Sequence, residues 1–241
     1  MPHNAVLIRK LETNFSLDRE EVDAIAAILF HIRSYTARYD IVLERDRPSQ
    51  CCLLLEGIAC RYKIVAGGRR QIFSFHLPGD VPDLHSLHLD TMDHCLATVT
   101  IGLIPHATLR EFMRTNPRIA EVFWRDTLIE ASIFRAWMAG LGARGAYVRV
   151  AHFFCEMVTR LRALDLVERA ACTVPMPLTQ TIMAEALGLT PVHINRTLGA
   201  LRENGLLTIV DGQMVILDWD RLQVGEFDPT YLHLRTTKML N

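Results

Sequence analysis

The sequence predicts an α+β protein with an N-terminal β-roll, a long central helix and a C-terminal winged helix–turn–helix. Short β-like runs separated by turn residues fill residues 35–104. A helix over about 117–138 is apolar around most of its circumference, and two helical segments precede a hairpin signal at Asp211-Gly212. The expected domains are a β-roll with an N-terminal helix at 1–116, a dimerisation helix and hinge at 117–145, and a winged helix–turn–helix at 146–241.

Composition narrows the class of protein before any motif is considered. The chain has 241 residues, of which 50% are hydrophobic. Its formal net charge is −1, so its total charge favours neither a nucleic acid nor a membrane as a partner. No apolar run reaches the length of about 18 residues that spans a bilayer. Charges interrupt the N-terminal segment, so we expect no signal peptide. The 6 cysteines lack CxxC spacing, which favours free thiols in a reducing cytoplasm.

The N-terminal half changes from a helical to a β pattern. Apolar residues at helical spacing predict a helix over 17–33, namely Val22, Ile25, Ile28, Leu29 and Ile32. Strands are predicted from the runs DIVL, CCLLLEG, ACRYKIV, QIFSFHL and LATVTIGLI, with turns at Gly67-Gly68 and Pro78-Gly79-Asp80. Cys51 and Cys52 would alternate across a strand. We favour packing for this pair, and a redox role is the alternative.

The helix over 117–138 has more apolar surface than one domain face requires. A helix that covers one face needs about a third of its circumference apolar, so we expect burial on two sides, one of them against a second chain. The alternative is a helix buried inside a single domain. Glycine-rich residues 140–145 then predict a break before a new helix. The residues expected at the dimer interface are Val122, Ile129, Ile133, Phe134 and Trp137.

Residues 178–207 have the spacing of a helix–turn–helix. Thr179 and Thr190 are suited to cap the two helices, Gly188 to form the tight turn between them, and Pro191 to start the second helix. Residues between the apolar positions of the second helix point outward, where such a helix meets base edges in a DNA groove. These outward residues are Val192, His193, Asn195 and Arg196. The alternative is an ordinary corner between two helices in a core.

These features together resemble the Crp/Fnr family of transcription regulators over nearly the whole chain. LLLEGIACRYKIVAGGRRQIFSFHLPGD resembles the family's hairpin before a Gly-Asp turn, LREFMRTNPRIAEVFW its entry to the dimer helix, and PVHINRTLGALRENGLL its recognition helix. The resemblance implies a cyclic-nucleotide-binding-like double-stranded β-helix that senses a signal. It also implies a homodimer on a palindromic operator in double-stranded DNA, with RNA polymerase as a partner and no membrane.

By position, the resemblance makes Arg196 the base-reading arginine, which can donate two hydrogen bonds to guanine. It also implies phosphate contacts at two helix N-termini, from Thr179, Gln180, Thr181 and Thr190. Val192 stands where the family usually has a glutamate, and valine can make only apolar contact, for instance with a thymine methyl group. The half-site that is common in the family is therefore not expected.

The sensor half departs further from the family. The residues expected nearest an effector are Gly79, Asp80, Asp83, His85 and His94. A cyclic-nucleotide cassette has an arginine for the cyclic phosphate, whereas no Arg or Lys occurs here between Arg70 and Arg110. A buried phosphate without such a partner is costly, so cyclic AMP is not expected as the effector. The N-terminus lacks the clustered cysteines of the iron–sulfur branch, and no cofactor is predicted.

Acids and histidines gather in the same stretch: Asp83, His85, His88, Asp90, Asp93 and His94. Such density can bind zinc or iron, with His85, His88 and His94 as candidate ligands, but we favour a polar surface loop. The rival function is a cupin-like metal-binding enzyme or sensor. No Ser/His/Asp, Cys/His or phosphate-loop pattern is visible, so we do not expect an enzyme. Four other histidines lie among apolar residues and are expected in or beside the core: His31, His76, His106 and His152.

Overall fold

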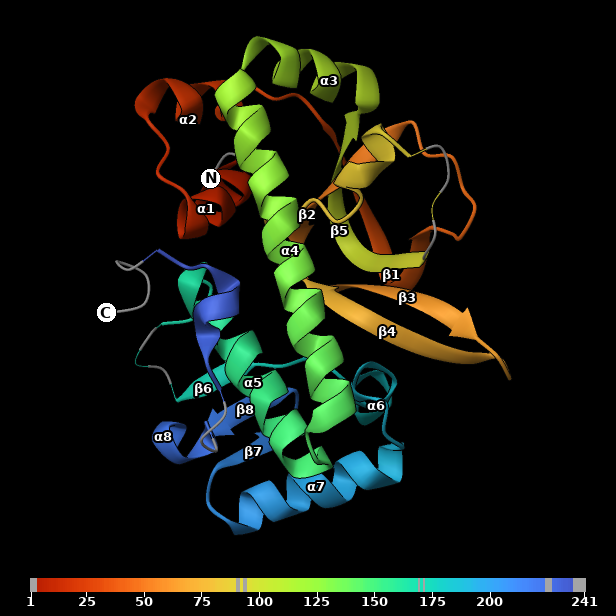
Figure 1. The fold of residues 1–241 in the computed structure, drawn as a ribbon, viewed down its shortest axis with the longest axis vertical. Coiled ribbons are helices and arrows are strands. Elements are labelled where there is room, and N and C mark those ends of the chain that lie inside the picture. The colour runs from red at the N-terminus through yellow and green to blue at the C-terminus, as the bar shows by residue number, and fades with distance from the viewer. Residues whose placement is uncertain are drawn as a thin grey trace. The chain divides into compact units, whose positions relative to one another are not determined.

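The computed structural model describes residues 4–89, 92, 95–168, 170, 172–223 and 227–235, without the side chains of 36–38 and 95–99. The chain divides into two compact units, 1–130 and 131–241. The first unit combines a five-stranded sheet with helices, and the second combines helices with a three-stranded sheet (Figure 1). The predicted α+β class is confirmed. No helix in the described ranges is long and apolar enough to cross a membrane.

Two helices precede the sheet: α1 (Ala5–Asn14) and α2 (Arg19–Ala26). At the start of α2, the Asp18 and Glu21 carboxylates each accept a hydrogen bond from the other's backbone N–H, at 2.9 and 2.8 Å. The helix predicted over 17–33 is right within α2 and wrong beyond it. From His31 the chain is a strand, because pairing with the strand Cys95–Pro105 satisfies its backbone hydrogen bonds. Leu29, expected on the apolar face of that helix, is 79% exposed. Sequence reasoning did not predict α1.

The sheet of the first unit is antiparallel. Its strands are β1 (His31–Val42), β2 (Gln50–Glu56), β3 (Ala59–Val65), β4 (Arg69–His76) and β5 (Cys95–Pro105). β5 is central, since β1, β2 and β3 all pair with it, and β4 pairs with β3. The hairpin between β3 and β4 turns at Gly67 and Gly68, whose φ angles of +81° and +73° suit residues without a Cβ.

The vicinal cysteines alternate across β2, as predicted. Cys51 is opposite Ile104 of β5 and Cys52 is opposite Leu103. Cys51 belongs to the core cluster under the helices, and Cys52 belongs to a second cluster on the other face of the strand. Burial raises the pKa of both thiols well above the ordinary value, so both stay protonated. This environment gives the redox alternative no support.

Three more elements follow in the chain: η1 (Leu84–Leu87), α3 (His106–Thr115) and α4 (Pro117–Ala143). α4 contributes to both units. Its first turns pack Ile119, Val122 and Phe123 into the core cluster that holds Cys51. The predicted break at 140–145 is confirmed: α4 ends at Ala143, and Arg144 and Gly145 precede the next helix.

The second unit contains the predicted helix–turn–helix and hairpin. Its elements are α5 (Ala146–Ala163), β6 (Thr173–Pro175), α6 (Gln180–Leu187), α7 (Pro191–Glu203), β7 (Leu207–Val210), β8 (Gln213–Ile216), α8 (Trp219–Leu222) and η2 (Pro229–Leu232). Asp211 and Gly212 connect β7 to β8 with φ angles of +50° and +72°, which confirms the tight two-residue turn. β6 adds a third strand to this sheet beside β8 and was not predicted, because three residues carry no readable pattern.

Candidate nucleic-acid interface and sensor site

The helix–turn–helix is built by two capped helices. The Thr179 hydroxyl accepts a hydrogen bond from the Ile182 N–H at 3.3 Å, and the Thr190 hydroxyl accepts one from the His193 N–H at 3.1 Å. Gly188 follows α6 with a φ of +62°, and Pro191 is the first residue of α7. Both predicted caps and the predicted turn are therefore present, which fixes the start of α7 directly after the turn.

One face of α7 is buried and the opposite face is exposed. Ile194 and Leu201 are fully buried. Of the four residues predicted to point outward, Val192 is 80% exposed, Asn195 and Arg196 are exposed, and His193 is half-buried. The candidate phosphate contacts at the starts of α6 and α7 are also exposed. They are Thr179, Gln180, Thr181 and Thr190.

The structure brings the start of α6 beside the outward face of α7. The Asn195 side chain donates a hydrogen bond from Nδ2 to Oε1 of Gln180 at 3.3 Å, although the two residues lie 15 positions apart. The predicted contacts on α6 and α7 therefore form one continuous surface. Two helix N-termini open onto it, where backbone N–H groups and helix dipoles favour an anion such as phosphate.

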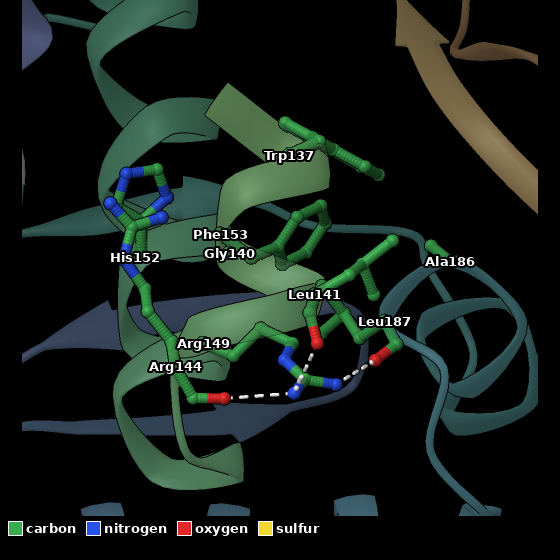
Figure 2. Close-up of a pocket in the computed structure, with 9 residues that line it drawn as sticks. All are labelled: Trp137, Gly140, Leu141, Arg144, Arg149, His152, Phe153, Ala186 and Leu187. Carbon is green, nitrogen blue, oxygen red and sulfur yellow. Dashed lines mark hydrogen bonds between the residues drawn. The ribbon is translucent and has the colours of Figure 1, made fainter. Parts of the chain in front are cut away.

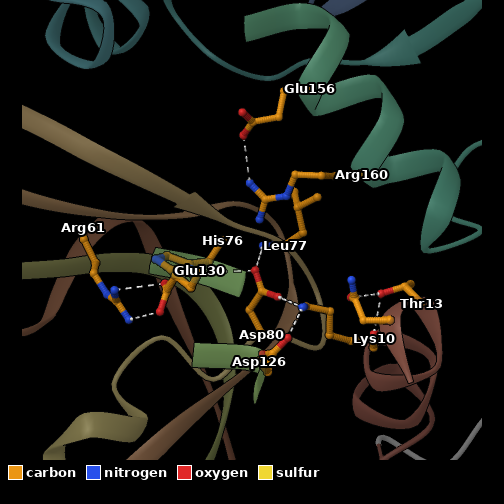
Figure 3. A network of polar contacts seen from close by, with 11 residues as sticks. Lys10, Thr13, Arg61, His76, Leu77, Asp80, Asp126, Glu130, Glu156 and Arg160 are labelled. Atoms are coloured by element: carbon orange, nitrogen blue, oxygen red, sulfur yellow. Dashed lines mark hydrogen bonds and ion pairs between the residues drawn. The ribbon is translucent and has the colours of Figure 1, made fainter. Parts of the chain in front are cut away.

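In the sensor half, α1 covers the predicted Gly79-Asp80 turn. Gly79 has a φ of +97°, and a Cβ there would lie 2.4 Å from the Val6 carbonyl oxygen and 2.5 Å from Cβ of Lys10. Oδ2 of Asp80 accepts a hydrogen bond from the Leu77 N–H at 2.9 Å, and Oδ1 lies 3.6 Å from Nζ of Lys10 (Figure 3). The turn is therefore occupied by side chains and backbone of its own chain.

An ionic cluster extends from this turn to α4. Nζ of Lys10 lies 2.7 Å from Oδ1 of Asp126, and Nη1 of Arg61 lies 2.9 Å from Oε1 of Glu130 (Figure 3). The His76 ring lies between the two pairs, with Nδ1 at 3.5 Å from Oε1 of Glu130. Burial and the Arg61 charge lower the pKa of His76, so its ring is neutral at physiological pH.

Asp83, predicted to lie near an effector, is instead part of the core. It is 0% exposed, and its Oδ1 accepts a hydrogen bond from the Cys52 N–H at 2.8 Å. Burial raises its pKa to about 6. The Asp83 side chain satisfies the Cys52 N–H near the start of β2, so the prediction that Asp83 lies at an accessible site is wrong.

The candidate metal ligands do not assemble within the part of the chain that the structure describes. His85 is half-buried and His88 is exposed, whereas Asp90, Asp93 and His94 lie outside the described residues. Among described positions, no three His, Cys, Asp or Glu residues come close enough to hold a metal ion.

Three of the four other histidines are buried with partners, as expected. Nε2 of His76 lies 2.9 Å from the Ser74 hydroxyl, and Nε2 of His106 lies 2.9 Å from the Ser86 hydroxyl. His152 stacks on the Tyr231 ring. The expectation is wrong for His31, which is exposed because the chain has entered β1 there.

The residues of α4 that were predicted at a dimer interface differ in how far their own chain buries them. Val122 is 7% exposed and lies in the core of its own unit, and Ile129 packs partly against that core. Ile133 and Phe134 are half-buried. Trp137, also half-buried, donates a hydrogen bond from Nε1 to the buried Glu156 at 2.9 Å.

A more exposed apolar stripe on α4 was not among the residues predicted at the dimer interface. It comprises Trp124, Leu128 and Met138, which are 64%, 49% and 72% exposed. The signal was present in the sequence, because Trp124 and Leu128 are four residues apart and share one helix face. Sequence alone does not say which of several apolar faces the chain's own core covers.

Comparison with known proteins agrees with this geometry. Residues 148–224 match the Crp-like helix-turn-helix domain. The nitrogen fixation regulation protein FixK of Bradyrhizobium diazoefficiens is 32% identical over 182 residues, which is 75% of this chain and 75% of that protein. The transcriptional activator protein FnrL of Cereibacter sphaeroides is 29% identical over 214 residues, 85% of this chain and 84% of that protein.

Solved structures give the same result. The structure of FixK2 from Bradyrhizobium japonicum is similar with a TM-score of 0.73 and 26% identity, over 82% of this chain and 97% of that chain. A transcriptional regulator of the CRP family from Thermus thermophilus shares the fold, with a TM-score of 0.61 and 19% identity over 83% of this chain and 96% of that chain. From its domain match, its relatives and its fold, the chain belongs to the Crp/Fnr family of transcriptional regulators.

Proposed function

We propose that this regulator binds double-stranded DNA as a homodimer and reads a palindromic operator through α7. The observation that carries the proposal is the outward face of α7, where Val192, Asn195 and Arg196 are exposed beside a capped helix start. A helix that packed only as a corner in a core would have no need for the exposed polar side chains of Asn195 and Arg196 next to its N-terminus. This supports a recognition helix in the major groove.

Each residue on this surface has a chemistry suited to DNA. Arg196 can donate two hydrogen bonds to O6 and N7 of one guanine, and Val192 can contact a thymine methyl group. Thr179 and Thr190 lie at exposed helix starts, where hydroxyl and backbone N–H groups can bind phosphates. Arg196 therefore supplies specificity, and the two threonines orient the protein on the duplex.

A second copy of the chain strengthens the binding. One helix–turn–helix with few cationic residues makes a limited number of phosphate contacts, whereas a dimer doubles them. The exposed stripe of Trp124, Leu128 and Met138 on α4 supports an interface between two copies. A symmetric pair of recognition helices would read two inverted half-sites.

We infer that the signal is not cyclic AMP. No Arg or Lys lies between Arg70 and Arg110 to bind a cyclic phosphate, and the Gly79-Asp80 turn is closed by α1. Asp83, which was expected near an effector, is buried against the Cys52 backbone. The relatives are regulators, and no described group of residues could hold a metal ion, so the cupin-like enzyme alternative gains no support.

The decisive experiment selects an operator from random duplexes and then titrates the protein against that operator and a scrambled duplex at one fixed salt concentration. We expect the operator to bind about 10³-fold or more tightly than the scrambled duplex, as specific regulators do. Equal affinity for both duplexes contradicts sequence-specific recognition. Sedimentation of the complex then gives the number of protein chains on each operator.

A further inference from the structure

Arg149 joins three pieces of the second unit through its guanidinium group (Figure 2). Nη1 donates a hydrogen bond to the carbonyl oxygen of Leu187 at 2.7 Å. Nη2 donates to the carbonyl oxygens of Leu141 at 3.1 Å and Arg144 at 2.8 Å. Leu141 lies in the last turn of α4, Arg144 connects α4 to α5, and Leu187 ends α6. One side chain in the first turn of α5 therefore ties the end of the long helix to the helix–turn–helix.

The chemistry of this contact favours arginine. Carbonyl groups at a helix C-terminus lack intrahelical partners and carry partial negative charge, so the Arg149 cation is favourable at the ends of α4 and α6 together. The planar guanidinium holds its donors in fixed directions, whereas a lysine ammonium is a single flexible point charge. All three acceptors are backbone atoms, so the contact fixes the main chain.

Apolar packing acts at the same place. A Cβ added to Gly188 would lie 3.3 Å from Cδ2 of Leu141, so the last turn of α4 packs closely against the turn after α6. Thr190, which caps α7, follows two residues later. The Arg149 contact and the Leu141 packing thus hold the segment from which the reading helix starts.

We propose that Arg149 is a positioning residue for DNA recognition. It fixes α6, and through the turn also α7, relative to the last turn of α4, and so sets the spacing between half-sites that the dimer accepts. The inference rests on the proposed function, because half-site spacing has meaning only for a dimer that reads two half-sites. Arg149 itself contacts no base in this role, since its donors are directed at backbone carbonyls.

The test compares affinities for the selected operator and for duplexes in which the two half-sites are one base pair closer or farther apart. The proteins are wild type, Arg149→Met, Arg149→Lys and the control Arg144→Met, which removes an equal charge but keeps its carbonyl acceptor. We expect Arg149→Met to lose about tenfold in affinity for the selected spacing, the worth of a charged hydrogen bond. We also expect its preference for that spacing to fall to about twofold, because a loosened reading helix tolerates other separations.

Further measurements separate positioning from other roles. Arg149→Lys should recover part of the spacing preference, and Arg144→Met should keep it. The salt dependence of binding should be the same for wild type and Arg149→Met, because no phosphate contact is lost. An Arg149→Met protein with the wild-type spacing preference overturns the proposal even if its overall affinity falls, because general instability weakens binding to every duplex alike.

Hydrogen exchange of the DNA-free protein tests the clamp without the proposed function. In Arg149→Met, the amides of residues 187–190 should exchange faster than in Arg144→Met, including the Leu189 N–H that is bonded to the Ala184 carbonyl at 3.1 Å. Equal exchange in the two variants overturns the clamp. A wild-type protein that prefers no operator contradicts the proposed function, whereas the exchange rates still decide whether Arg149 holds the turn.

Discussion

Nζ of Lys10 lies 2.7 Å from Oδ1 of Asp126, so an ion pair joins α1 to α4 across 116 positions of sequence. The two side chains are only 15% and 23% exposed. Burial raises the pKa of Asp126, and the Lys10 charge opposes that rise. The same ammonium lies 3.6 Å from Oδ1 of Asp80, so α1 contacts both the Gly79-Asp80 turn and the long helix.

Replacing Lys10 by Met should destabilise the first unit, because Asp80 and Asp126 are then left partly buried without their cation. We expect the free energy of unfolding to fall by about 2 kcal/mol, measured by denaturant titration. Arg19→Met is the control, since Arg19 is 94% exposed and pairs only loosely with Asp23 at 4.0 Å. Adding Asp126→Leu to Lys10→Met should recover part of the loss. Equal stability of wild type and Lys10→Met contradicts this role of the ion pair.

Local signals predicted the DNA-binding half well. The caps at Thr179 and Thr190, the αL turn at Gly188 and the hairpin at Asp211-Gly212 are each encoded within a few residues. Their geometry depends little on the rest of the chain. For that reason the helix–turn–helix, the hairpin and the exposed face of α7 could be predicted from the sequence.

The sensor half depends on contacts that the sequence does not encode locally. A helix was predicted through Leu29 and Ile32, but the chain forms β1 from His31. The pairing of β1 with β5, about 70 residues away, stabilises the strand more than the helical spacing of apolar residues stabilises a helix. Asp80 and Asp83 were expected near an effector from their order along the chain. They are instead bound by Lys10 and by the Cys52 backbone, and no local pattern indicates such partners.

The buried carboxyl of Asp83 should make stability depend on pH. Burial raises its pKa to about 6 in the folded chain, above its ordinary value of 3.8, so the folded state binds this proton more tightly than the unfolded state. Protonation therefore stabilises the fold as pH falls from about 6.5 to about 4, and that stability is lost as pH rises again. Relative to Asp83→Asn, which cannot titrate, wild type should gain about 2 to 3 kcal/mol over this range. Denaturant titrations at several pH values measure the difference, and parallel curves for the two proteins contradict it.

Leu128→Glu should give monomers, because Leu128 lies on the exposed apolar stripe of the proposed dimer interface, where a buried unpaired carboxylate is costly. Leu29→Glu is the matched control, since Leu29 is also exposed but lies on another surface. Sedimentation velocity should show monomers for Leu128→Glu and dimers for the control. A dimer of unchanged stability in Leu128→Glu would mean that the interface lies elsewhere.

Cyclic AMP should neither bind nor change DNA affinity. The Gly79-Asp80 turn is packed under α1 so closely that a Cβ added at Gly79 would clash with the Val6 carbonyl oxygen. Titration calorimetry with about millimolar nucleotide should show no saturable heat. Such a result means that the Kd is above about 1 mM, which corresponds to less than about 4 kcal/mol of binding free energy. Saturable binding accompanied by tighter operator binding contradicts the prediction.

Arg196→Ala should separate base reading from phosphate binding. Arg196 is exposed in the second turn of α7, on the face opposite Ile194 and Leu201, where its guanidinium can reach a guanine. The loss should be roughly 1 to 3 kcal/mol per half-site on the selected operator, with relaxed preference at one base pair. A dimer then loses roughly 2 to 6 kcal/mol, a factor of about 30 to 10⁴ in affinity.

Two further variants on the same helix calibrate this result. Thr190→Ala removes the cap and a candidate phosphate contact, so it should weaken binding to operator and scrambled duplex alike. Arg202→Ala removes an equal charge from the exposed last turn of α7, and should leave base preference unchanged. Titrations of all variants against both duplexes at fixed salt give the comparison. If Arg196→Ala weakens both duplexes equally, Arg196 is only a phosphate contact, and if it weakens neither, α7 is not the reading helix.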